Sequence, residues 1–344
     1  MTQNKKNYRA LIIHPNNDYN CGDQITFLGT KALLTQALGG SEYLDVVQFD
    51  ILRAERELDT YVSQYCWGKI DLIVLAGSPW LWVGLENSIK YRLLTDAIRR
   101  YPNAKYLALG IGSCFDKKVY EGIMTNVDKW FYNSNKRKEF LKYVYSRFSA
   151  IYTRDAFAQL LFEQLNIKSK LVYDTSLYST YFIKNNSNTK RNKKVLWFYD
   201  PSKGVSSNNL SFNPNDYIEY QLDWAKDNNA DIYCNTAADI SSLMERGINA
   251  SFSVDLIHLS KKFTEYDEML TGRIHMGVLG FISRIPKITL LPIDTRFLTV
   301  EKLGFNIKFI GSPWKYKPSV KPNDIFKELE KEEKFIIGEL KDAL

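Results

Sequence analysis

The sequence predicts an α/β protein built from two doubly wound domains that face each other across a cleft. Three observations lead to this prediction. Short apolar runs alternate with amphipathic stretches along the chain, the pattern of a mostly parallel sheet covered by helices. The 344 residues exceed the usual size of one compact core. A stretch without any apolar residue, 184–194, interrupts the alternation near the middle of the chain.

The first domain is expected over residues 1–183. Its strands are short apolar runs, and stretches with helical periodicity separate them. Strands are predicted at Tyr8–His14, Tyr43–Phe49, Asp71–Leu75, Lys105–Leu109, Ala150–Thr153 and Lys170–Val172. Helices are predicted at Gln24–Leu38, Ile51–Tyr65, Asn87–Arg100, Arg137–Tyr145 and Asp155–Leu165. In such a sheet a ligand binds beyond the carboxyl ends of the strands.

The second domain is expected over residues 195–320, after a solvated linker at 184–194 that carries several like charges. Strands are predicted at Val195–Tyr199, Asp231–Cys234, Ser251–Val254 and Lys287–Leu291. Helices are predicted at Pro214–Asp227, Ala237–Glu245, near Phe263–Leu270 and directly after His275. A charged amphipathic helix is expected over residues 321–344, beyond the pattern-breaking stretch Lys315–Pro322, and we expect it to cross back to the first domain.

Composition and charge narrow the class of protein. A hydrophobic content of 45% with 25% charged residues is typical of soluble globular proteins. The net charge of +7 favours anionic ligands without choosing among nucleic acid, a phosphorylated metabolite and an acidic membrane surface. No apolar run precedes the first strand, and no stretch approaches the roughly 20 apolar residues of a membrane span. We therefore expect a cytoplasmic protein, which would reach the inner face of a membrane only through its surface.

The cysteines and histidines predict no metal site. The four cysteines are far apart and form no Cys-x-x-Cys pair, a pattern that fits a reducing cytosol. The three histidines are scattered, and the sequence has no His-x-x-x-His pair or carboxylate-rich loop. Two of the histidines, His14 and His258, are interpreted as structural.

The segment Asn20-Cys21-Gly22-Asp23 lies between the first predicted strand and the first predicted helix. Gly22 permits a close approach of the backbone to another group. Asp23 has two interpretations of equal weight: an N-cap of the helix, which is worth about 1 kcal/mol, or a contact to substrate.

A second candidate, Arg154, ends a predicted strand directly before a helix that Asp155 would cap. Its planar guanidinium suits a carboxylate or a phosphate. The alternative is a surface arginine that pairs with Asp155 or Glu163.

The third segment, Gly272-Arg273-Ile274-His275, interrupts an apolar stretch. In an extended chain, Arg273 and His275 would point to the same side and could face one ligand. A core histidine bonded to a backbone carbonyl is the alternative, and the adjacent arginine argues against it because two such groups need an anionic partner. Helix amides after His275 would add a further anion-binding element.

Trp80 and Trp82 follow the turn at Gly77-Ser78-Pro79. An aromatic face stacks well on the apolar side of a sugar ring, so both are candidate acceptor contacts. Packing in the core is the more common role of a tryptophan.

Together, these segments resemble the polysaccharide pyruvyl transferase family over most of the chain. Residues 20–23 are similar to the Asn-x-Gly-Asp motif that opens the family, 154–155 to its Arg-Asp pair, and 273–275 to its Arg-x-His signature. The chain departs from the family at Ser78-Pro79-Trp80, where members commonly have glycines. No lysine stands near 292–296 where members often have one, and Arg296 is the expected substitute.

The resemblance implies a GT-B-like fold and a transferase that uses phosphoenolpyruvate as co-substrate and no other cofactor. It implies that His275 is the acid that protonates the donor and that Asp23 is the base or anchor for the acceptor hydroxyl. It places donor-binding residues at Arg154, Arg273 and Arg296, and acceptor-binding residues at Asn20, Gly22, Trp80 and Trp82.

The implied partners are phosphoenolpyruvate and a glycan or lipid-linked oligosaccharide, not nucleic acid; peripheral membrane association is compatible with them. The acceptor sugar, the choice between ketal and enolpyruvyl product, and the oligomeric state stay open. Two other functions stay open as well. One is a glycosyltransferase that uses a nucleotide sugar, with Asp255 recruited to the ribose, and the other is a binding protein without catalysis.

Overall fold

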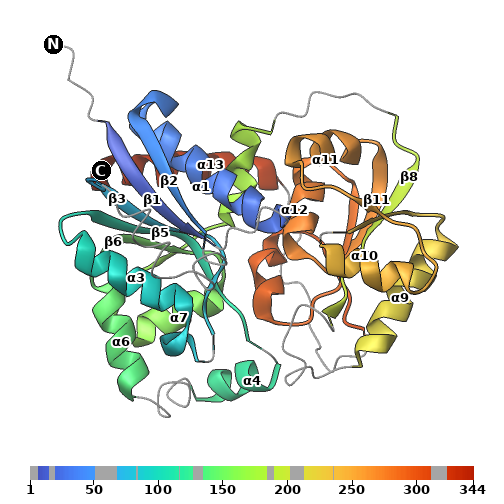
Figure 1. Ribbon diagram of the computed structural model, residues 1–344, viewed down its shortest axis with the longest axis horizontal. Helices are drawn as coiled ribbons and strands as arrows, with labels where there is room; N and C mark the ends of the chain where they lie inside the picture. Colours follow the sequence, from blue (N-terminus) through green and yellow to red (C-terminus); the bar gives the residue numbers. More distant parts are fainter. Residues whose placement is uncertain are drawn as a thin grey trace.

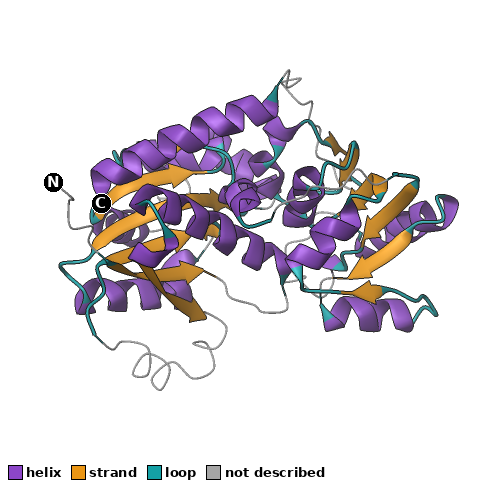
Figure 2. Cartoon of the chain, turned by 90° about the horizontal axis from the view of Figure 1, so that it is seen from above, coloured by secondary structure: helices purple, strands orange, loops and turns teal. Residues whose placement is uncertain are grey.

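The structure, a computed structural model, describes residues 7–14, 20–50, 68–82, 84–115, 117–126, 135–183, 190–201, 213–234, 236–310 and 324–344. Two parallel sheets stand side by side with helices on their faces (Figures 1 and 2). The predicted helix Ile51–Tyr65 and the stretch Lys315–Pro322 lie outside the described residues.

The first sheet has seven strands in the order β2-β1-β3-β5-β6-β7, with β4 paired to β5. All pairings are parallel. Its strands are β1 (Tyr8–His14), β2 (Leu44–Asp50), β3 (Leu72–Ala76), β4 (Pro79–Leu81), β5 (Lys105–Ser113), β6 (Phe148–Thr153) and β7 (Lys170–Leu171). The helices are α1 (Cys21–Leu38), α3 (Ile89–Arg100), α4 (Lys117–Thr125), α6 (Asn135–Tyr145) and α7 (Ala156–Gln164), with 3-10 turns η1 (Ser41–Tyr43), η2 (Leu85–Asn87) and η3 (Thr175–Tyr181).

The second sheet has the order β10-β9-β8-β11-β12-β13, again with parallel pairings. Its strands are β8 (Lys193–Trp197), β9 (Asp231–Cys234), β10 (Ser251–Phe252), β11 (Tyr266–Thr271), β12 (Lys287–Leu290) and β13 (Asn306–Ile307). The helices are α9 (Pro214–Asp227), α10 (Ala237–Met244), α11 (Leu256–Phe263) and α12 (Ile274–Ile282), with 3-10 turns η5 (Thr295–Thr299) and η6 (Glu301–Leu303). The predicted two-sheet α/β architecture is confirmed.

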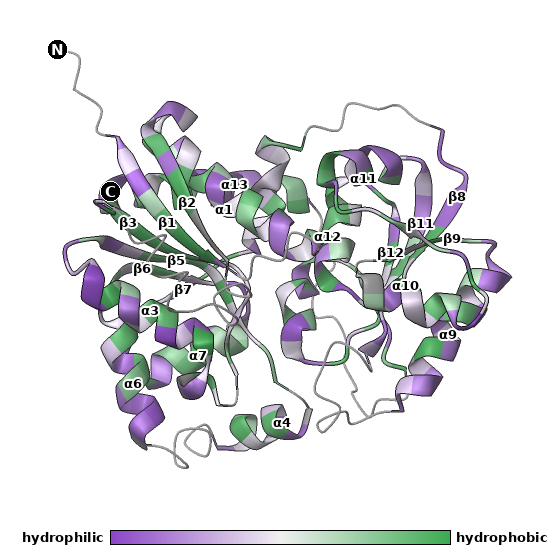
Figure 3. Ribbon diagram, in the orientation of Figure 1, coloured by the Kyte–Doolittle hydropathy of each residue, from purple (hydrophilic) through white to green (hydrophobic). Residues whose placement is uncertain are grey.

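The central strands are apolar on both faces because helices cover both sides of each sheet (Figure 3). Every residue of β3 is buried, as are the last five residues of β1. One continuous core cluster includes Ile12 of the first sheet and Trp197 of the second. Helices α1 and α12 contact each other between the sheets, so the two units are joined by apolar packing.

The C-terminal helix α13 (Ile325–Ala343) returns to the first sheet, as predicted. It packs on α1, where Gln36 Nε2 donates to Glu333 Oε1 at 2.7 Å. Tyr173 OH donates to Glu328 Oε2 at 2.8 Å, and Tyr8 OH donates to the carbonyl of Leu344 at 2.7 Å. These contacts attach the C-terminal helix to β1, to α1 and to the segment that follows β7.

The prediction of a helix near Phe263–Leu270 is wrong. The helix α11 ends at Phe263, and Tyr266–Thr271 forms β11, paired with β8 and β12 on its two sides. Asp255 begins α11 by accepting from the amides of Ile257 and His258 at 2.9 and 3.0 Å. Glu268 makes this segment a poor match to a strand pattern, because a central strand rarely carries a carboxylate. In the structure, Lys194 and Lys287 form ion pairs with Glu268 and neutralise its charge.

The end of the predicted linker is also different. Lys193 and Lys194 are the first residues of β8 rather than solvated connector, and they pair with Glu265 and Glu268. The carboxylates of the neighbouring chain segment compensate the like charges that suggested a connector. Residues 184–189 lie outside the described residues, and the predicted domain boundaries stay predictions.

Candidate active site

A pocket of about 730 Å³, part of it open to solvent, lies where the carboxyl ends of both sheets meet. Residues from both units line it: Asn20, Gly22, Asp23, Ser78, Pro79, Arg154, Tyr199, Gly272, Arg273, Ile274, His275, Met276, Pro292, Ile293, Asp294 and Arg296. Seven of the nine residues proposed from the sequence are therefore in one place. The other two, Trp80 and Trp82, are not among the lining residues.

The start of α1 shapes one wall of the pocket. Asn20, not Asp23, is the N-cap: its side-chain oxygen accepts from the amide of Gly22 at 2.9 Å. Asn20 Nδ2 donates to Asp23 Oδ2 at 2.9 Å, which orients that carboxyl group. The capping interpretation of Asp23 is thus wrong, and its carboxyl group belongs to the pocket wall.

Asp23 has the electrostatics of a proton-transfer group. Burial raises the pKa of its carboxyl to about 7, and the charges of Lys90, Arg273 and Arg154 limit the increase. A carboxyl group with a pKa near 7 exists in both forms at neutral pH, which suits a general base or acid. Asp23 can therefore accept a proton from a bound hydroxyl.

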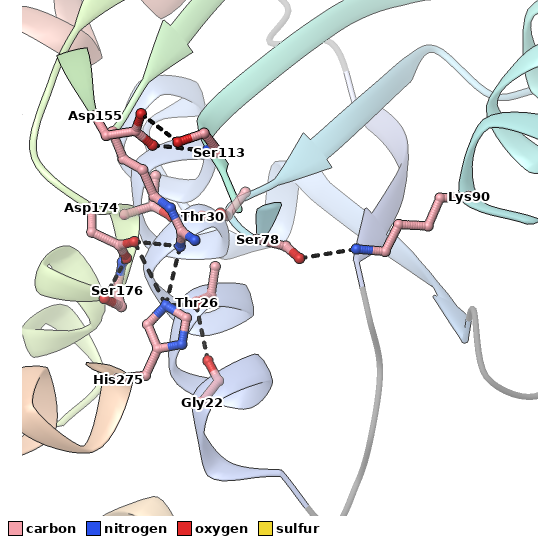
Figure 4. Close-up of polar contacts among 12 residues, drawn as sticks. Gly22, Thr26, Thr30, Ser78, Lys90, Ser113, Asp155, Asp174, Ser176 and His275 are labelled. Carbon is pink, nitrogen blue, oxygen red and sulfur yellow. Dashed lines mark hydrogen bonds and ion pairs between the residues drawn. The ribbon is translucent and has the colours of Figure 1, made fainter. Parts of the chain in front are cut away.

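At the inner wall of the pocket, His275 lies next to the buried Asp174 (Figure 4), and Arg154 contacts both. Arg154 Nη1 donates to Asp174 Oδ2 at 2.7 Å, and both side chains are almost completely inaccessible. The same Nη1 lies 3.2 Å from Nε2 of His275, and Asp174 Oδ2 lies 3.6 Å from that nitrogen. Arg154 lines the pocket, and its ion-pair partner is the buried Asp174 rather than Asp155 or Glu163, the two alternatives.

Asp174 remains ionised inside this cluster. Burial by itself would raise the pKa of the carboxyl, but the Arg154 guanidinium and the contact with His275 outweigh it and hold the pKa well below its usual range. The amide of Ser176 donates to Asp174 Oδ1 at 2.8 Å, and the hydroxyl of Ser176 donates to the same oxygen. The cluster thus contains a permanent negative charge next to two cationic or titratable groups.

Two glycines allow this close arrangement. A Cβ at Gly22 would lie 3.0 Å from Nδ1 of His275. A Cβ at Gly112 would lie 2.4 Å from Nε of Arg154 and 2.8 Å from the carboxylate of Asp155. Asp155 caps α7 through the amide of Ala158 at 2.7 Å, as predicted. The sequence expectation that Gly22 admits a close neighbour is confirmed.

Arg273 and His275 both line the pocket, but not as an extended pair. Arg273 is the extended N-cap residue of α12, and His275 belongs to the first turn of that helix. The guanidinium of Arg273 stacks on the ring of Tyr199 at 4.1 Å, and its Nη2 donates to Asp239 Oδ2 at 3.2 Å. The helix start turns the two side chains apart, so Arg273 contacts the second unit and His275 contacts the first.

The N-terminus of α12 opens into the pocket. Its N-cap residue makes no side-chain hydrogen bond to the first turn, and Ile274, His275 and Met276 all line the cavity. The Nε atoms of Arg154 and Arg273 are both buried with no hydrogen-bond partner among the described residues. Helix amides and unsatisfied guanidinium donors together suit an anion.

Arg296 is more constrained than the other two arginines. Its Nε donates to both carboxylate oxygens of Asp294, at 2.8 and 2.9 Å, and Nη2 lies 2.6 Å from Oδ2. Its pKa is raised well above the usual value: burial opposes the charge, but Asp294 outweighs that effect. Arg296 reaches the pocket already neutralised, and its role as a substitute for the family lysine stays a prediction.

The expectation that Trp80 stacks on a sugar is wrong for this structure. Its side chain is fully buried and packs edge-on against Tyr91 at 5.8 Å, so the core role applies. Trp82 is partly exposed, but it lies against Lys90 (5.2 Å from the ammonium to the ring centre) rather than in the pocket. Lys90 also donates to Ser78 Oγ at 3.2 Å, and Ser78 lines the cavity with a positive φ of 63°.

Sequence reasoning assigned no role to several groups that shape the site: Asp174, Asp239, Tyr199, Lys90 and Asp294. A signal existed for Asp174, which follows the predicted strand Lys170–Val172 at the edge where ligands bind. No comparable signal existed for Lys90 or Asp239. Both lie on helices, α3 and α10, and only the packing of these helices places their side chains near the pocket. Among the described residues, no group of three or more His, Cys, Asp or Glu side chains could hold a metal ion, and no helix is long and apolar enough to cross a bilayer.

Comparison with known proteins supports this picture. The model of the polysaccharide pyruvyl transferase family matches residues 20–291, which include most of the pocket. A comparison with curated protein sequences found no significant match.

Solved structures show the same fold at low sequence identity. The chain is similar to UDP-N-acetylglucosamine 2-epimerase from Rickettsia bellii (TM-score 0.50, 12% identity, covering 97% of each chain). It is also similar to the UDP-GlcNAc 2-epimerase from Methanocaldococcus jannaschii, solved with UDP-GlcNAc and UDP (TM-score 0.51, 8% identity, covering 89% of each chain). The chain is similar as well to the MnaA protein of S. aureus, solved with UDP. The TM-score is 0.51 and the sequence identity 9%, and the match covers 98% of this chain and 91% of that one. The fold is therefore the GT-B-like pair of Rossmann-like domains.

Proposed function

This chain belongs to the polysaccharide pyruvyl transferase family, and on that premise we propose that it uses phosphoenolpyruvate to place a pyruvate ketal on a pair of sugar hydroxyls. The family supports a transferase that acts on a glycan. The observation that carries the proposal is the meeting of Asp23, Arg154, Arg273 and His275 in one pocket between the two sheets. These are an acid, a base and two cations, which the reaction needs.

The donor carries a carboxylate and a phosphate, and the reaction begins by protonation of its methylene carbon. We assign this proton to His275. Arg154, Arg273 and the amides at the start of α12 would hold the two anionic groups, since both arginines and the first residues of α12 line the pocket. Arg296 would add a weaker third cation, because Asp294 already neutralises it.

Protonation leaves the second carbon of the donor electrophilic. One sugar hydroxyl attacks this carbon while Asp23 accepts its proton, and the bond to the phosphate oxygen breaks. A second hydroxyl then attacks the same carbon and closes the ketal. Of the two hydroxyl protons released, one balances the proton that went to the methylene carbon, and the other leaves with the phosphate.

The wild-type protein distinguishes this function from its alternatives. We expect release of inorganic phosphate from phosphoenolpyruvate that depends on a glycan acceptor, and a glycan product heavier by one pyruvate ketal in mass spectrometry. A product that retains the enol double bond would indicate enolpyruvyl transfer. Release of UDP from nucleotide sugars without any phosphate release would contradict the proposal. Against that last alternative, Asp255 caps α11 and does not line the pocket.

The pH dependence should follow Asp23. Lys90 is the strongest of the neighbouring charges that lower the pKa of Asp23. In Lys90→Met this pKa rises above about 7, so the base becomes ionised only at higher pH. We expect the acidic limb of kcat/KM against pH to move upward by about 0.5 to 1 unit.

Lys287→Met is the matched control, because Lys287 is exposed and pairs with Glu268 away from the pocket. Its profile should coincide with that of the wild type. An acidic limb that stays in place in Lys90→Met would exclude Asp23 as the titrating base.

A further inference from the structure

The imidazole of His275 is held from one side only. Its Nε2 lies near Arg154 Nη1 (3.2 Å), Thr26 Oγ1 (3.4 Å) and Asp174 Oδ2 (3.6 Å). No described residue hydrogen-bonds to Nδ1, which lies next to Gly22 at the pocket wall. Figure 4 shows the ring between Asp174 and Gly22, with its dashed contacts directed away from Gly22.

Asp174 lies outside the set of pocket-lining residues, behind His275 and Arg154. Its carboxylate is completely buried and is itself held in place, because Ser176 donates to Oδ1 and leaves Oδ2 directed at the guanidinium and the imidazole. A buried carboxylate that contacts both a cation and an imidazole fixes the orientation of the ring.

We infer that Asp174 is the positioning residue of this site. Together with Arg154 it holds His275 through Nε2, and it leaves Nδ1 as the nitrogen that protonates phosphoenolpyruvate. The orienting contact does not depend on the substrate, whereas the identity of the proton acceptor rests on the proposed function. The test therefore has one readout without substrate and one with it.

Charged groups around the ring determine the direction of the expected effects. Asp174 favours the imidazolium, and Arg154 opposes it; Asp23 on α1 and Arg273 at the start of α12 line the same pocket. In Asp174→Asn the carboxylate is lost and the charge of Arg154 is no longer compensated. Both changes disfavour the charged ring.

The substrate-free readout is the titration of His275 by NMR. The chain has three histidines, so the ring signals of His275 can be assigned by comparison with His275→Gln. In Asp174→Asn we expect the titration midpoint of His275 to move to lower pH by about one unit or more. Ser176→Ala removes a hydroxyl donor to the carboxylate and leaves its charge less stabilised, so the midpoint should move the opposite way, by a few tenths of a unit.

Asp155→Asn is the matched control. Asp155 is equally buried and adjacent to Arg154 in the sequence, but its carboxylate accepts from Ser113 and Ala158 rather than contacting the imidazole. This variant should lose stability without moving the His275 midpoint. A midpoint that is unchanged in folded Asp174→Asn overturns the inference. If Asp174→Asn does not fold, an absent or downward shift in Ser176→Ala overturns it.

The second readout is the pH profile of turnover. Because an acid must be protonated, the alkaline limb of kcat in Asp174→Asn should move to lower pH in parallel with the NMR midpoint, while KM for phosphoenolpyruvate changes less than kcat. If the wild type does not turn over phosphoenolpyruvate, the proposed function fails, and the NMR titration still decides whether Asp174 positions His275. An NMR shift without a parallel shift of the alkaline limb overturns the assignment of His275 as the proton donor.

Discussion

His275→Gln is expected to lower kcat for phosphate release by about 10² to 10⁴, the usual contribution of a positioned general acid. Glutamine is close in size and keeps a polar group near Arg154 and Asp174, so the cluster remains filled. It has no proton to give at neutral pH. The Michaelis constant for phosphoenolpyruvate should change much less than kcat, because the arginines and the helix amides that hold the donor remain. Phosphate release and ketal formation, measured with the same acceptor, check this result.

The control for this substitution is His258→Gln. His258 is exposed on α11, outside the pocket, and should tolerate the change without loss of turnover. Full activity in His275→Gln would reject the assignment of the acid. If the wild type and both variants bind phosphoenolpyruvate but none of them releases phosphate, the chain is a binding protein without catalysis, one of the alternatives that the sequence leaves open.

The second large effect is expected at Arg273. In Arg273→Met the donor loses a cation, and Asp239, which is almost fully buried, loses its ion pair. The lost hydrogen bond to a charged group of the donor is worth roughly 2 kcal/mol, so kcat/KM for phosphoenolpyruvate should fall by about 30-fold. The loss of the ion pair with Asp239 should lower the free energy of unfolding instead. Arg273→Lys keeps the charge but lacks the planar fork and the stacking on Tyr199, and should give an intermediate loss.

Arg246→Met provides the comparison for Arg273→Met. Arg246 also belongs to the second unit and pairs with Glu219, but on the surface, where such pairs contribute 0 to about 1 kcal/mol. Its kinetics should match the wild type. Denaturant unfolding of each variant separates loss of donor binding from loss of stability. A kcat/KM within a few-fold of the wild type in folded Arg273→Met would remove Arg273 from the donor site.

Periodicity was sufficient for most elements because each is dominated by its own local pattern. Residues 8–14 and 214–227 form the predicted strand and helix with the predicted bounds. The failure at 266–271 has a tertiary cause: the strand has Lys194 and Lys287 as partners for its Glu268, and neither is visible from within the segment. Lys193 and Lys194 were assigned to the linker for the same reason.

The candidate site divides in the same way. Asp23, Arg154, Arg273 and His275 were candidates because residue types with suitable chemistry stand at strand ends and helix starts, and the family resemblance assigned them to the site. It could not identify their partners. Asp174 is 101 positions from His275 in the chain, and only the packing of η3, α1 and α12 brings the two together. The same packing excluded Trp80, whose ring turns into the core behind a strained Ser78.

By itself, the sequence determined the α/β class, the two sheets and the candidate residues for the site, because periodicity and side-chain type are local properties. Only the tertiary structure decided which side chains line the pocket and which contact those side chains from outside it. Burial and charge pairing depend on neighbours distant in sequence. Those neighbours raise the pKa of Asp23 to about 7 and neutralise Arg296 with Asp294. They also place an ionised Asp174 against His275.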